Sequence, residues 1–183
     1  MSTAAPATPA ISLDTPRYHL RSVTLADVDE EYLRWFRDEG VMRFVGPDLS
    51  GLGLEQHAAI VRSCDDRTRI LLVVVDRESG RRVGLLRASV DPRHGRAQTS
   101  VILADPAHWG VAAVGETHRA LRLFLFESRD VRKITFSVYG AHEVMLRILP
   151  RYGAVSEGVL RAHDVVPGLG VQDVHLFAMF RPE

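Results

Sequence analysis

The turn at residues 105–115 carries the clearest chemical signal in this sequence. An apolar run at residues 100–104 ends in Asp105 and Pro106, a turn of small residues follows, and an amphipathic helix begins at Val111. The first backbone N–H groups of a helix have no partner inside the helix, and they carry about half a positive charge from the helix dipole. Such groups can hold a phosphate or pyrophosphate. The sequence therefore predicts a site for a nucleotide-like cofactor at this turn.

Two side chains farther along the chain could take part in proton transfer. His142 stands at the start of a predicted helix, and its ordinary pKa of about 6.5 suits a general base at neutral pH. Tyr139 ends the preceding strand and offers a hydroxyl group. Each also has a plainer interpretation, since His142 can be a polar residue at a helix start and Tyr139 a packing residue. We take both as candidate catalytic residues.

Other polar and aromatic residues are candidates for contact with the reactants. His163 and Asp164 follow a predicted strand, and Trp35 closes the first predicted helix, where core packing is its alternative role. His108 lies in the turn, where it either contacts a phosphate or adenine group or faces solvent. The eight histidines show no tight metal-binding spacing, so we expect no metal site.

Hydrophobic periodicity and turn residues predict the elements that must position these groups. The expected order is β-α-α-β-β-β-α-β-α-β-β. Strands are expected at residues 18–23, 70–75, 83–90, 97–104, 133–138, 154–161 and 172–180. One helix is expected to follow the cap at residues 24–27 and to end near residue 38, and further helices are expected at residues 54–64, 111–128 and 143–152. Thr24 and Asp27 form a reciprocal capping pair, residues 41–53 form a loop, and Gly153 caps the last helix. This order predicts one mixed sheet covered by helices on both faces.

Length and composition favour one ordinary globular domain. The chain has 183 residues, of which 46% are hydrophobic and 25% charged, and a chain of this size can bury a substantial core. Residues 17–183 are expected to form the domain, and residues 1–16 a flexible tail without the features of a secretory signal. No apolar run is long enough to cross a bilayer. A single cysteine, Cys64, permits no internal disulfide, so we expect a cytoplasmic protein without a membrane partner.

The charge of the chain weighs against a nucleic-acid partner. Lysines and arginines together number 23, and so do aspartates and glutamates, which gives a formal net charge of zero. Nucleic-acid-binding domains usually carry an excess of basic residues.

Four short segments in this order resemble the GNAT acyltransferase superfamily, most closely the branch that acetylates ribosomal-protein N-termini and small amines. The segments are residues 20–27, residues 105–110 with Glu116, residues 147–153, and residues 157–161 followed by Asp173. The resemblance extends from about Arg17 to Met179. It implies a GNAT fold of the mixed α/β (α+β) class, in which a central, mostly antiparallel sheet is splayed into a V and flanked by helices.

The resemblance also implies where two substrates bind. The donor is acetyl-CoA or another acyl-CoA, whose pyrophosphate binds the N–H groups of the turn and whose pantetheine arm pairs with the end of the preceding strand. The residues implied for this site are Leu103, Ala104, Trp109, Gly110, Val111, Ala112, Ala113, Val114 and Gly115. The amine acceptor enters from the opposite side, near Trp35, the 41–53 loop and the 161–171 connection. It attacks the thioester directly in a ternary complex, and a backbone N–H of the 97–104 strand holds the oxyanion.

Several positions depart from the pattern of the family. The phosphate turn usually carries Gln or Arg followed by small residues, but this chain has Trp109, Ala112 and Val114, and Val114 is bulky enough to crowd a phosphate. Many relatives carry a glutamate base where this chain has Thr99 and a tyrosine acid where it has Leu149. A thiol with a pKa of about 8.5 still leaves as a thiolate at modest cost, and an α-amine with a pKa of about 8 is partly neutral near pH 7.5. This degenerate site therefore favours an amine of low pKa as acceptor.

Two alternatives stay open. The altered turn is also compatible with an acyl carrier protein or an aminoacyl-tRNA as donor, although the zero net charge argues against tRNA. The chain could instead be a non-catalytic member of the family that binds a ligand or partner without turnover. The sequence does not decide between a small-molecule and a peptide acceptor, and it leaves open the acyl chain length and the oligomeric state, a homodimer included.

Overall fold

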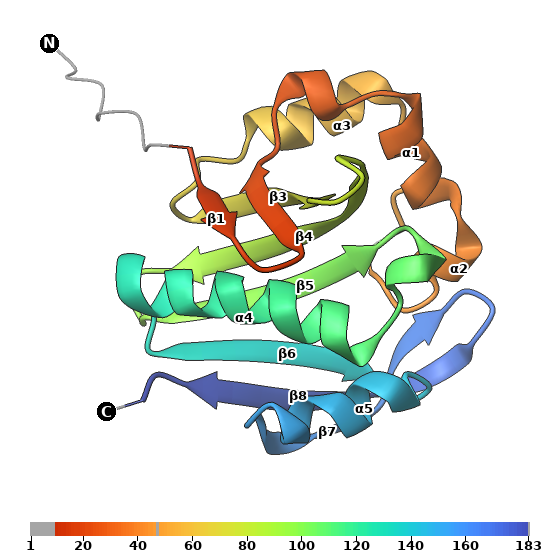
Figure 1. The fold of residues 1–183 in the computed structure, drawn as a ribbon. Helices are drawn as coiled ribbons and strands as arrows, with labels where there is room; N and C mark the ends of the chain where they lie inside the picture. Colours follow the sequence, from red (N-terminus) through yellow and green to blue (C-terminus); the bar gives the residue numbers. More distant parts are fainter. Residues whose placement is uncertain (1–9, 47, 183) are drawn as a thin grey trace, which may run out of the picture.

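The fold is built around one sheet, seen in a computed structural model that describes residues 10–46 and 48–182 (Figure 1). Within these residues, eight strands are arranged in the order β1–β2–β3–β4–β5–β6–β8–β7. The strands are β1 Ser12–Asp14, β2 Tyr18–Ser22, β3 Arg69–Asp76, β4 Arg82–Asp91, β5 Arg96–Leu103, β6 Lys133–Tyr139, β7 Val155–Val166 and β8 Gly170–Phe180. All neighbouring strands pair antiparallel except β5 and β6, which pair parallel. The predicted class, a mixed and mostly antiparallel α/β fold, is confirmed.

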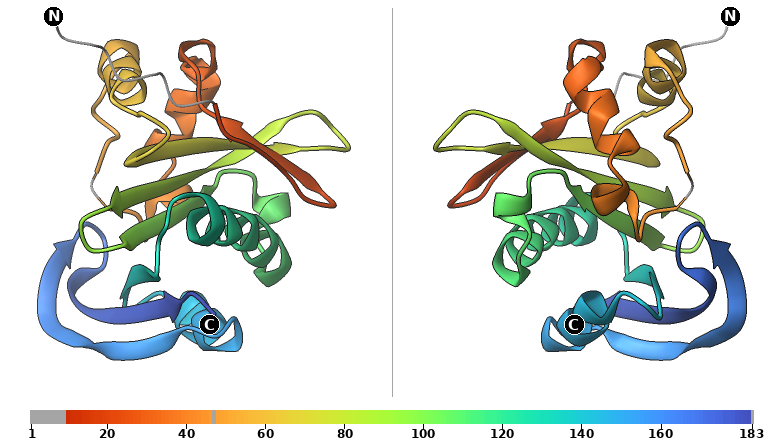
Figure 2. Two further views of the ribbon diagram at one scale, coloured as in Figure 1. Left: turned by 90° about the vertical axis from the view of Figure 1, so that its left-hand side faces the viewer. Right: turned by 90° about the vertical axis from the view of Figure 1, so that its right-hand side faces the viewer.

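Helices cover both faces of the sheet, as the sequence predicts (Figure 2). One face carries α1, α2 and α3, and the other carries α4 and α5. The helices are α1 Glu30–Arg37, α2 Glu39–Met42, α3 Leu54–Arg62, α4 Val111–Ser128 and α5 Glu143–Arg151, with short 3-10 helices η1 Leu25–Asp27 and η2 Pro106–His108 before α1 and α4. None of the helices in the described part of the chain is both long and apolar enough to span a membrane.

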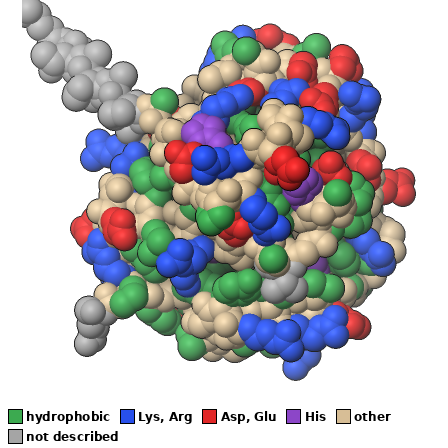
Figure 3. Space-filling model, in the orientation of Figure 1, with side chains coloured by type: hydrophobic (Ala, Val, Ile, Leu, Met, Phe, Trp, Pro, Cys, Tyr) green, Lys and Arg blue, Asp and Glu red, His purple; other side chains and the backbone are tan. Residues whose placement is uncertain are grey.

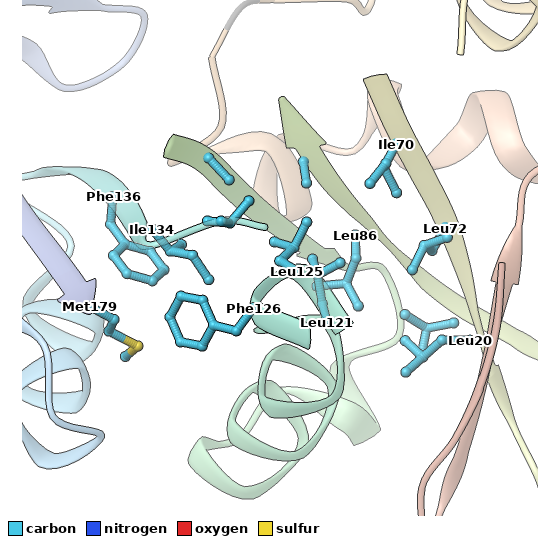
Figure 4. Close-up of a cluster of buried hydrophobic side chains, with 14 of the residues drawn as sticks. Leu20, Ile70, Leu72, Leu86, Leu121, Leu125, Phe126, Ile134, Phe136 and Met179 are labelled. Atoms are coloured by element: carbon cyan, nitrogen blue, oxygen red, sulfur yellow. The ribbon is translucent and has the colours of Figure 1, made fainter. Parts of the chain in front are cut away.

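The main core lies between the sheet and α4. Leu121 and Leu125 of α4 are fully buried and belong to one hydrophobic cluster with Leu86 of β4 and Ile134 of β6 (Figure 4). Burying a side chain of this size contributes about 1.5–3 kcal/mol. Because the cluster includes strands from both sides of the β5–β6 junction, α4 holds the two parts of the sheet together.

The sheet opens between β5 and β6. These strands share three residue pairs, the last of which joins Gln98 to Thr135, and then both run on without pairing (Figure 1). We call the unpaired stretches, residues 99–103 of β5 and 136–139 of β6, the fork. The fork is the V-shaped splay that the family resemblance implies.

Backbone groups of β5 face into the fork. The N–H of Ala104 donates to the carbonyl of Val83 at 2.8 Å, on the β4 side. Successive residues of a strand direct their N–H and C=O groups to opposite sides within the sheet. The groups of Val101 and Leu103 therefore point away from β4 and into the fork.

The prediction of a flexible tail up to residue 16 is wrong for its last part. Strand β1 pairs with β2, the N–H of Ser22 donates to the carbonyl of Ile11 at 3.0 Å, and the side chain of Ile11 is buried. Three residues are too short a run to show strand periodicity, so the sequence pattern did not reveal β1. Residues 1–9 of the predicted tail lie outside the described residues.

The first predicted helix is divided. Thr24 and Asp27 do cap its start, since the Asp27 carboxylate accepts the Thr24 N–H at 2.7 Å. The segment nevertheless leaves helical geometry at Val28, and α1 starts again with Asp29 as its N-cap, whose side chain accepts the N–H of Tyr32. The predicted loop at 41–53 likewise overlaps the end of the short helix α2. Because Asp29 provides a second N-cap, α1 begins after it and does not continue the helix that starts at Leu25.

Candidate functional site

The turn predicted to bind an anion forms the N-terminus of α4. Gly110 is the N-cap, and the first helical hydrogen bond runs from the N–H of Val114 to the Gly110 carbonyl at 3.1 Å. The N–H groups of Val111, Ala112 and Ala113 therefore have no partner inside the helix. Open space surrounds the position that a Cβ on Gly110 would occupy. Free N–H groups at an open surface are what an anion site requires.

Two further residues of the predicted donor turn pack against the protein. The side chain of Val114 packs against the main hydrophobic core. A Cβ on Gly115 would overlap the ring of Tyr152, which follows α5. Gly115 thus allows the close approach of Tyr152 to α4, a role that differs from the predicted contact with the donor.

A pocket of about 540 Å³ adjoins the start of α4. Its lining includes Arg17 and Arg81, but both cations have acidic partners: Arg17 pairs with Glu116 at 2.8 Å, and Arg81 lies 4.0 Å from Asp105. His108 forms part of the wall through a 2.9 Å hydrogen bond between its Nδ1 and the hydroxyl of Tyr18. The pocket is therefore polar and nearly balanced in charge.

Trp109 connects this turn to the open end of the fork. Its indole N–H donates to the carbonyl of Leu103, the last residue of β5, at 2.6 Å, and its ring lies near Gly40 of α2. About half of the Trp109 side chain is exposed. The backbone carbonyl of Leu103 therefore points towards the fork, whereas Ala104 directs its N–H to β4.

The other predicted site residues gather where β6 ends. The Tyr139 hydroxyl lies close enough to the carboxylate of Asp164 for that charge to affect its pKa, and a Cβ on Gly46 would lie 3.1 Å from the hydroxyl. Burial, and then the negative charge of Asp164, raise the pKa of Tyr139 above its usual value of 10. The phenol therefore stays protonated at neutral pH. The 41–53 loop, predicted to lie near the acceptor, reaches Tyr139 through Gly46.

His142 lies next to this pair as the N-cap of α5. Its ring stacks on Phe44, with ring centroids 4.1 Å apart and planes inclined by 17°. Burial lowers the pKa of His142 below its usual value of 6.5. The imidazole is therefore neutral at neutral pH and able to accept a proton. We call Tyr139, His142, Asp164 and Phe44 the β6-end cluster.

A bulge in β7 brings Asp164 to this cluster. The register between β7 and β8 shifts just before Asp164, and Ala162 within the shift has a φ of +46°. The Asp173 carboxylate supports this backbone by accepting the Ala162 N–H at 2.8 Å and pairing with Arg161 at 2.6 Å. Bulges of this kind re-aim side chains and are common beside functional sites.

Two predicted acceptor residues lie outside the cluster. His163 is exposed, and its Nε2 is 3.9 Å from the carboxylate of Asp164. Trp35 is buried in the core beneath α1–α3, where its ring packs against Tyr32. The surroundings of Trp35 match the core-packing alternative.

The positions where relatives carry acid–base residues are buried on the α4 face. Leu149 belongs to the main core. The hydroxyl oxygen of Thr99 lies 2.8 Å from Nε2 of His118 on α4. His118 was not among the residues predicted from the sequence, although it lies three and seven residues before the buried Leu121 and Leu125. A polar residue within the apolar stripe of an amphipathic helix was the available signal.

The charge distribution matches the composition. On the face that carries α4 and α5, acidic and basic side chains are interspersed (Figure 3). Within the described part of the chain, no group of three or more histidine, cysteine or carboxylate side chains is arranged to hold a metal ion.

The family follows from a comparison of sequences. Residues 17–155 match the family described as an acetyltransferase (GNAT) domain. The chain belongs to this family. GNAT acetyltransferases use acetyl-CoA, and the protein is accordingly an N-acetyltransferase. No curated protein sequence matches the chain.

Solved structures of GNAT proteins share this fold. The ribosomal L7/L12 α-N-protein acetyltransferase RimL, solved with coenzyme A, is 13% identical, with a TM-score of 0.81 over 93% of this chain and 98% of that one. The spermidine N-acetyltransferase of Vibrio cholerae, solved with CoA and spermine, is 19% identical, with a TM-score of 0.77 over 91% and 96% of the two chains. A GNAT acetyltransferase of Bacillus anthracis is 14% identical, with a TM-score of 0.77 over 93% and 98%.

Proposed function

We propose that this GNAT protein transfers an acetyl group from acetyl-CoA to a primary amine of a small molecule or peptide. The observation that carries the proposal is the meeting of the α4 N-terminus with the open end of the fork. A donor held there by its phosphates can extend into the gap between β5 and β6. Similar structures solved with CoA support the same donor.

Backbone groups would hold the donor. The free N–H groups of residues 111–113 suit its pyrophosphate, and the edge of β5 at Val101 and Leu103 suits its amide-bearing arm. The Leu103 carbonyl already accepts the Trp109 indole N–H, so Trp109 has to move if that carbonyl is to accept a donor amide. When bound, acetyl-CoA supplies an activated thioester carbonyl. A β5 N–H that points into the fork can hold the negative charge that develops on the carbonyl oxygen.

The β6-end cluster would receive the acceptor. Asp164 can accept a hydrogen bond from the amine, and neutral His142 can take up the proton that the amine loses on attack. Protonated Tyr139 can donate a hydrogen bond to a group of the acceptor other than the attacking nitrogen. The new N–C bond forms as the C–S bond of the thioester breaks, and CoA leaves as a thiolate. A general base contributes about 10²–10⁴-fold, whereas positioning two reactants can contribute about 7 kcal/mol or more. A site without the glutamate and tyrosine of many relatives can therefore still be active, best on an amine of low pKa.

The chemistry of the β6-end cluster also indicates which kind of amine could be the acceptor. One similar structure is named for a protein α-amine and another for spermidine, so a peptide and a small polyamine are both reasonable acceptors. The carboxylate of Asp164 favours an acceptor that carries N–H donors.

Donor binding and product formation test the proposal separately. Isothermal titration calorimetry should detect acetyl-CoA binding, and a panel of peptide and small-molecule amines should release free CoA thiol together with an acetylated product seen by mass spectrometry. Absence of acetyl-CoA binding at millimolar concentration would contradict the proposal. Transfer from an acyl carrier protein but not from acetyl-CoA would replace the donor, and binding without any product would favour a non-catalytic role.

A further inference from the structure

The inner end of the fork is covered on the α4 face by a polar pair that the proposed chemistry does not use. Thr99 is the first residue of β5 beyond its pairing with β6, and Phe136 stands at the same level of β6. His118 of α4 touches both strands. Its Nε2 is 2.8 Å from the Thr99 hydroxyl oxygen, and its ring centroid is 5.1 Å from that of Phe136. His118 thus spans the point where the strands separate.

The surroundings of His118 determine its charge and its exposure to solvent. Thr99 is buried, and Thr117 and Leu121 on either side of His118 along α4 have no exposed surface, whereas His118 keeps some. Burial lowers the pKa of His118 from 6.5 to about 4, so the ring is uncharged at neutral pH. At the inner end of the fork, Thr99 and His118 therefore form an uncharged surface held in place by the hydrogen bond between them.

The path of the donor leads to this surface. A donor anchored at the start of α4 enters the fork at Leu103, and its arm follows the free edge of β5 back towards Thr99. Leu103 and Thr99 are four residues apart in the strand, which corresponds to about 13 Å at roughly 3.3 Å per residue. If the N–H of Val101, which points into the fork, holds the thioester carbonyl, the acyl group is directed towards Thr99 and the carbonyl stays on the side of Tyr139, where the amine is proposed to bind.

We propose that Thr99 and His118 limit the length of the acyl group that the enzyme accepts, so that acetyl fits and longer chains collide with the imidazole. The proposal rests on the proposed function, since it assumes an acyl-CoA in the fork. One added methylene in a fitted pocket changes kcat/KM by about 10–200-fold. The enzyme should therefore prefer acetyl-CoA to butyryl-CoA by at least tenfold.

Truncation of His118 gives the direct test. The ratio of kcat/KM for acetyl-CoA to that for butyryl-CoA is measured with one accepted amine, and the affinity for both donors is measured by calorimetry. His118→Ala should lower the ratio about tenfold or more and strengthen butyryl-CoA binding relative to acetyl-CoA binding. His118→Phe, which keeps a ring at this position, should retain the preference.

Two further variants keep the test decisive. Thr99→Ala shortens this surface on the β5 side and should relax the preference in the same direction, even if His118→Ala fails to fold. Thr117→Ala truncates a neighbouring buried residue whose hydroxyl bonds to the α4 backbone at 2.8 Å, and it should leave the ratio unchanged.

The outcomes separate the two proposals. If the wild-type protein binds and transfers acetyl groups but folded His118→Ala and Thr99→Ala keep the wild-type ratio, the length limit is overturned and the proposed function stands. The same holds if Thr117→Ala relaxes the ratio as much as they do. If the wild-type protein binds no acyl-CoA, both proposals fail.

Discussion

Tyr139 and Asp164 form a matched donor and acceptor at the end of β6. Because burial and the Asp164 charge raise the pKa of Tyr139, the phenol keeps its proton at pH values where an α-amine is already neutral. Both residues, His142 and the 41–53 loop were predicted from the sequence as candidates, and in the structure they lie close together. The contact itself was not predictable, because it depends on the bulge in β7 and on the approach of Gly46.

We expect Asp164→Asn to raise the KM for the amine about tenfold with a smaller effect on kcat. The reason is the loss of a charged hydrogen-bond acceptor, which is typically worth about 1.5–3 kcal/mol. Steady-state kinetics at saturating acetyl-CoA measures the effect. Asp130→Asn is the matched control, because its carboxylate is almost fully exposed and its positive φ suits asparagine. An unchanged KM in Asp164→Asn would remove this residue from the acceptor site.

The lowered pKa of His118 predicts that the stability of the fold depends on pH. Its pKa falls from 6.5 in the unfolded chain to about 4 in the folded protein. Between these values the unfolded chain binds a proton that the folded protein does not, so the free energy of unfolding decreases as the pH falls from 6.5 towards 4. His118→Gln lacks this component, and urea denaturation at pH 7.5, 6 and 5 should show a weaker loss of stability than in the wild type. Parallel losses would show that His118 titrates normally.

Among the helices and strands, the local sequence predicted most of the element order. It failed where the structure of a segment depends on pairing with another strand or on a second helix cap. The long strands and α4 have clear periodicity, and Gly153 ends α5 with a φ of +85°. Strand β1 depends on its pairing with β2, and the division of the first helix depends on Asp29. Val114 looked able to crowd a phosphate because sequence position alone does not give the direction of a side chain on a helix.

The lack of a side chain at Gly84 of β4 allows the end of β5 beside the fork to pack closely against β4. A Cβ there would overlap the carbonyl oxygen of Ile102 and press on Leu103. Gly84→Ala should therefore lower the free energy of unfolding by about 1–3 kcal/mol and weaken acetyl-CoA binding by displacing Leu103. Denaturation and calorimetry measure the two effects. Gly51→Ala, where a Cβ meets nothing within 4 Å, should change neither, and a neutral Gly84→Ala would show that β5 tolerates the shift.

At the scale of the whole molecule, two parts of one sheet meet at three residue pairs and share a core under α4. Residues of β3 and β4 lie in that core with residues of β6 and β8. The family resemblance implied the splayed sheet, but the sequence did not show which side chains bridge it. That information lies in contacts between residues far apart in the chain, such as Thr99 with His118.

Ile134 tests the strength of this junction. It belongs to the second of the three residue pairs and is fully buried in the main core. Ile134→Ala should lower the free energy of unfolding by about 2–5 kcal/mol, as truncations of buried isoleucine do. Ser137→Ala, an exposed position on the same strand, should change it by about 0.5 kcal/mol or less. Similar small effects at both positions in urea denaturation would mean that the junction contributes little.

The free edge of β5 also makes the fork visible to amide hydrogen exchange. The N–H groups of Val101 and Leu103 face the gap, whereas that of Ile102 faces β4. Deuterium should therefore enter at Val101 and Leu103 sooner than at Ile102. A donor that pairs with this edge would slow those two amides selectively, and NMR could thus reveal the bound position of the donor without any turnover.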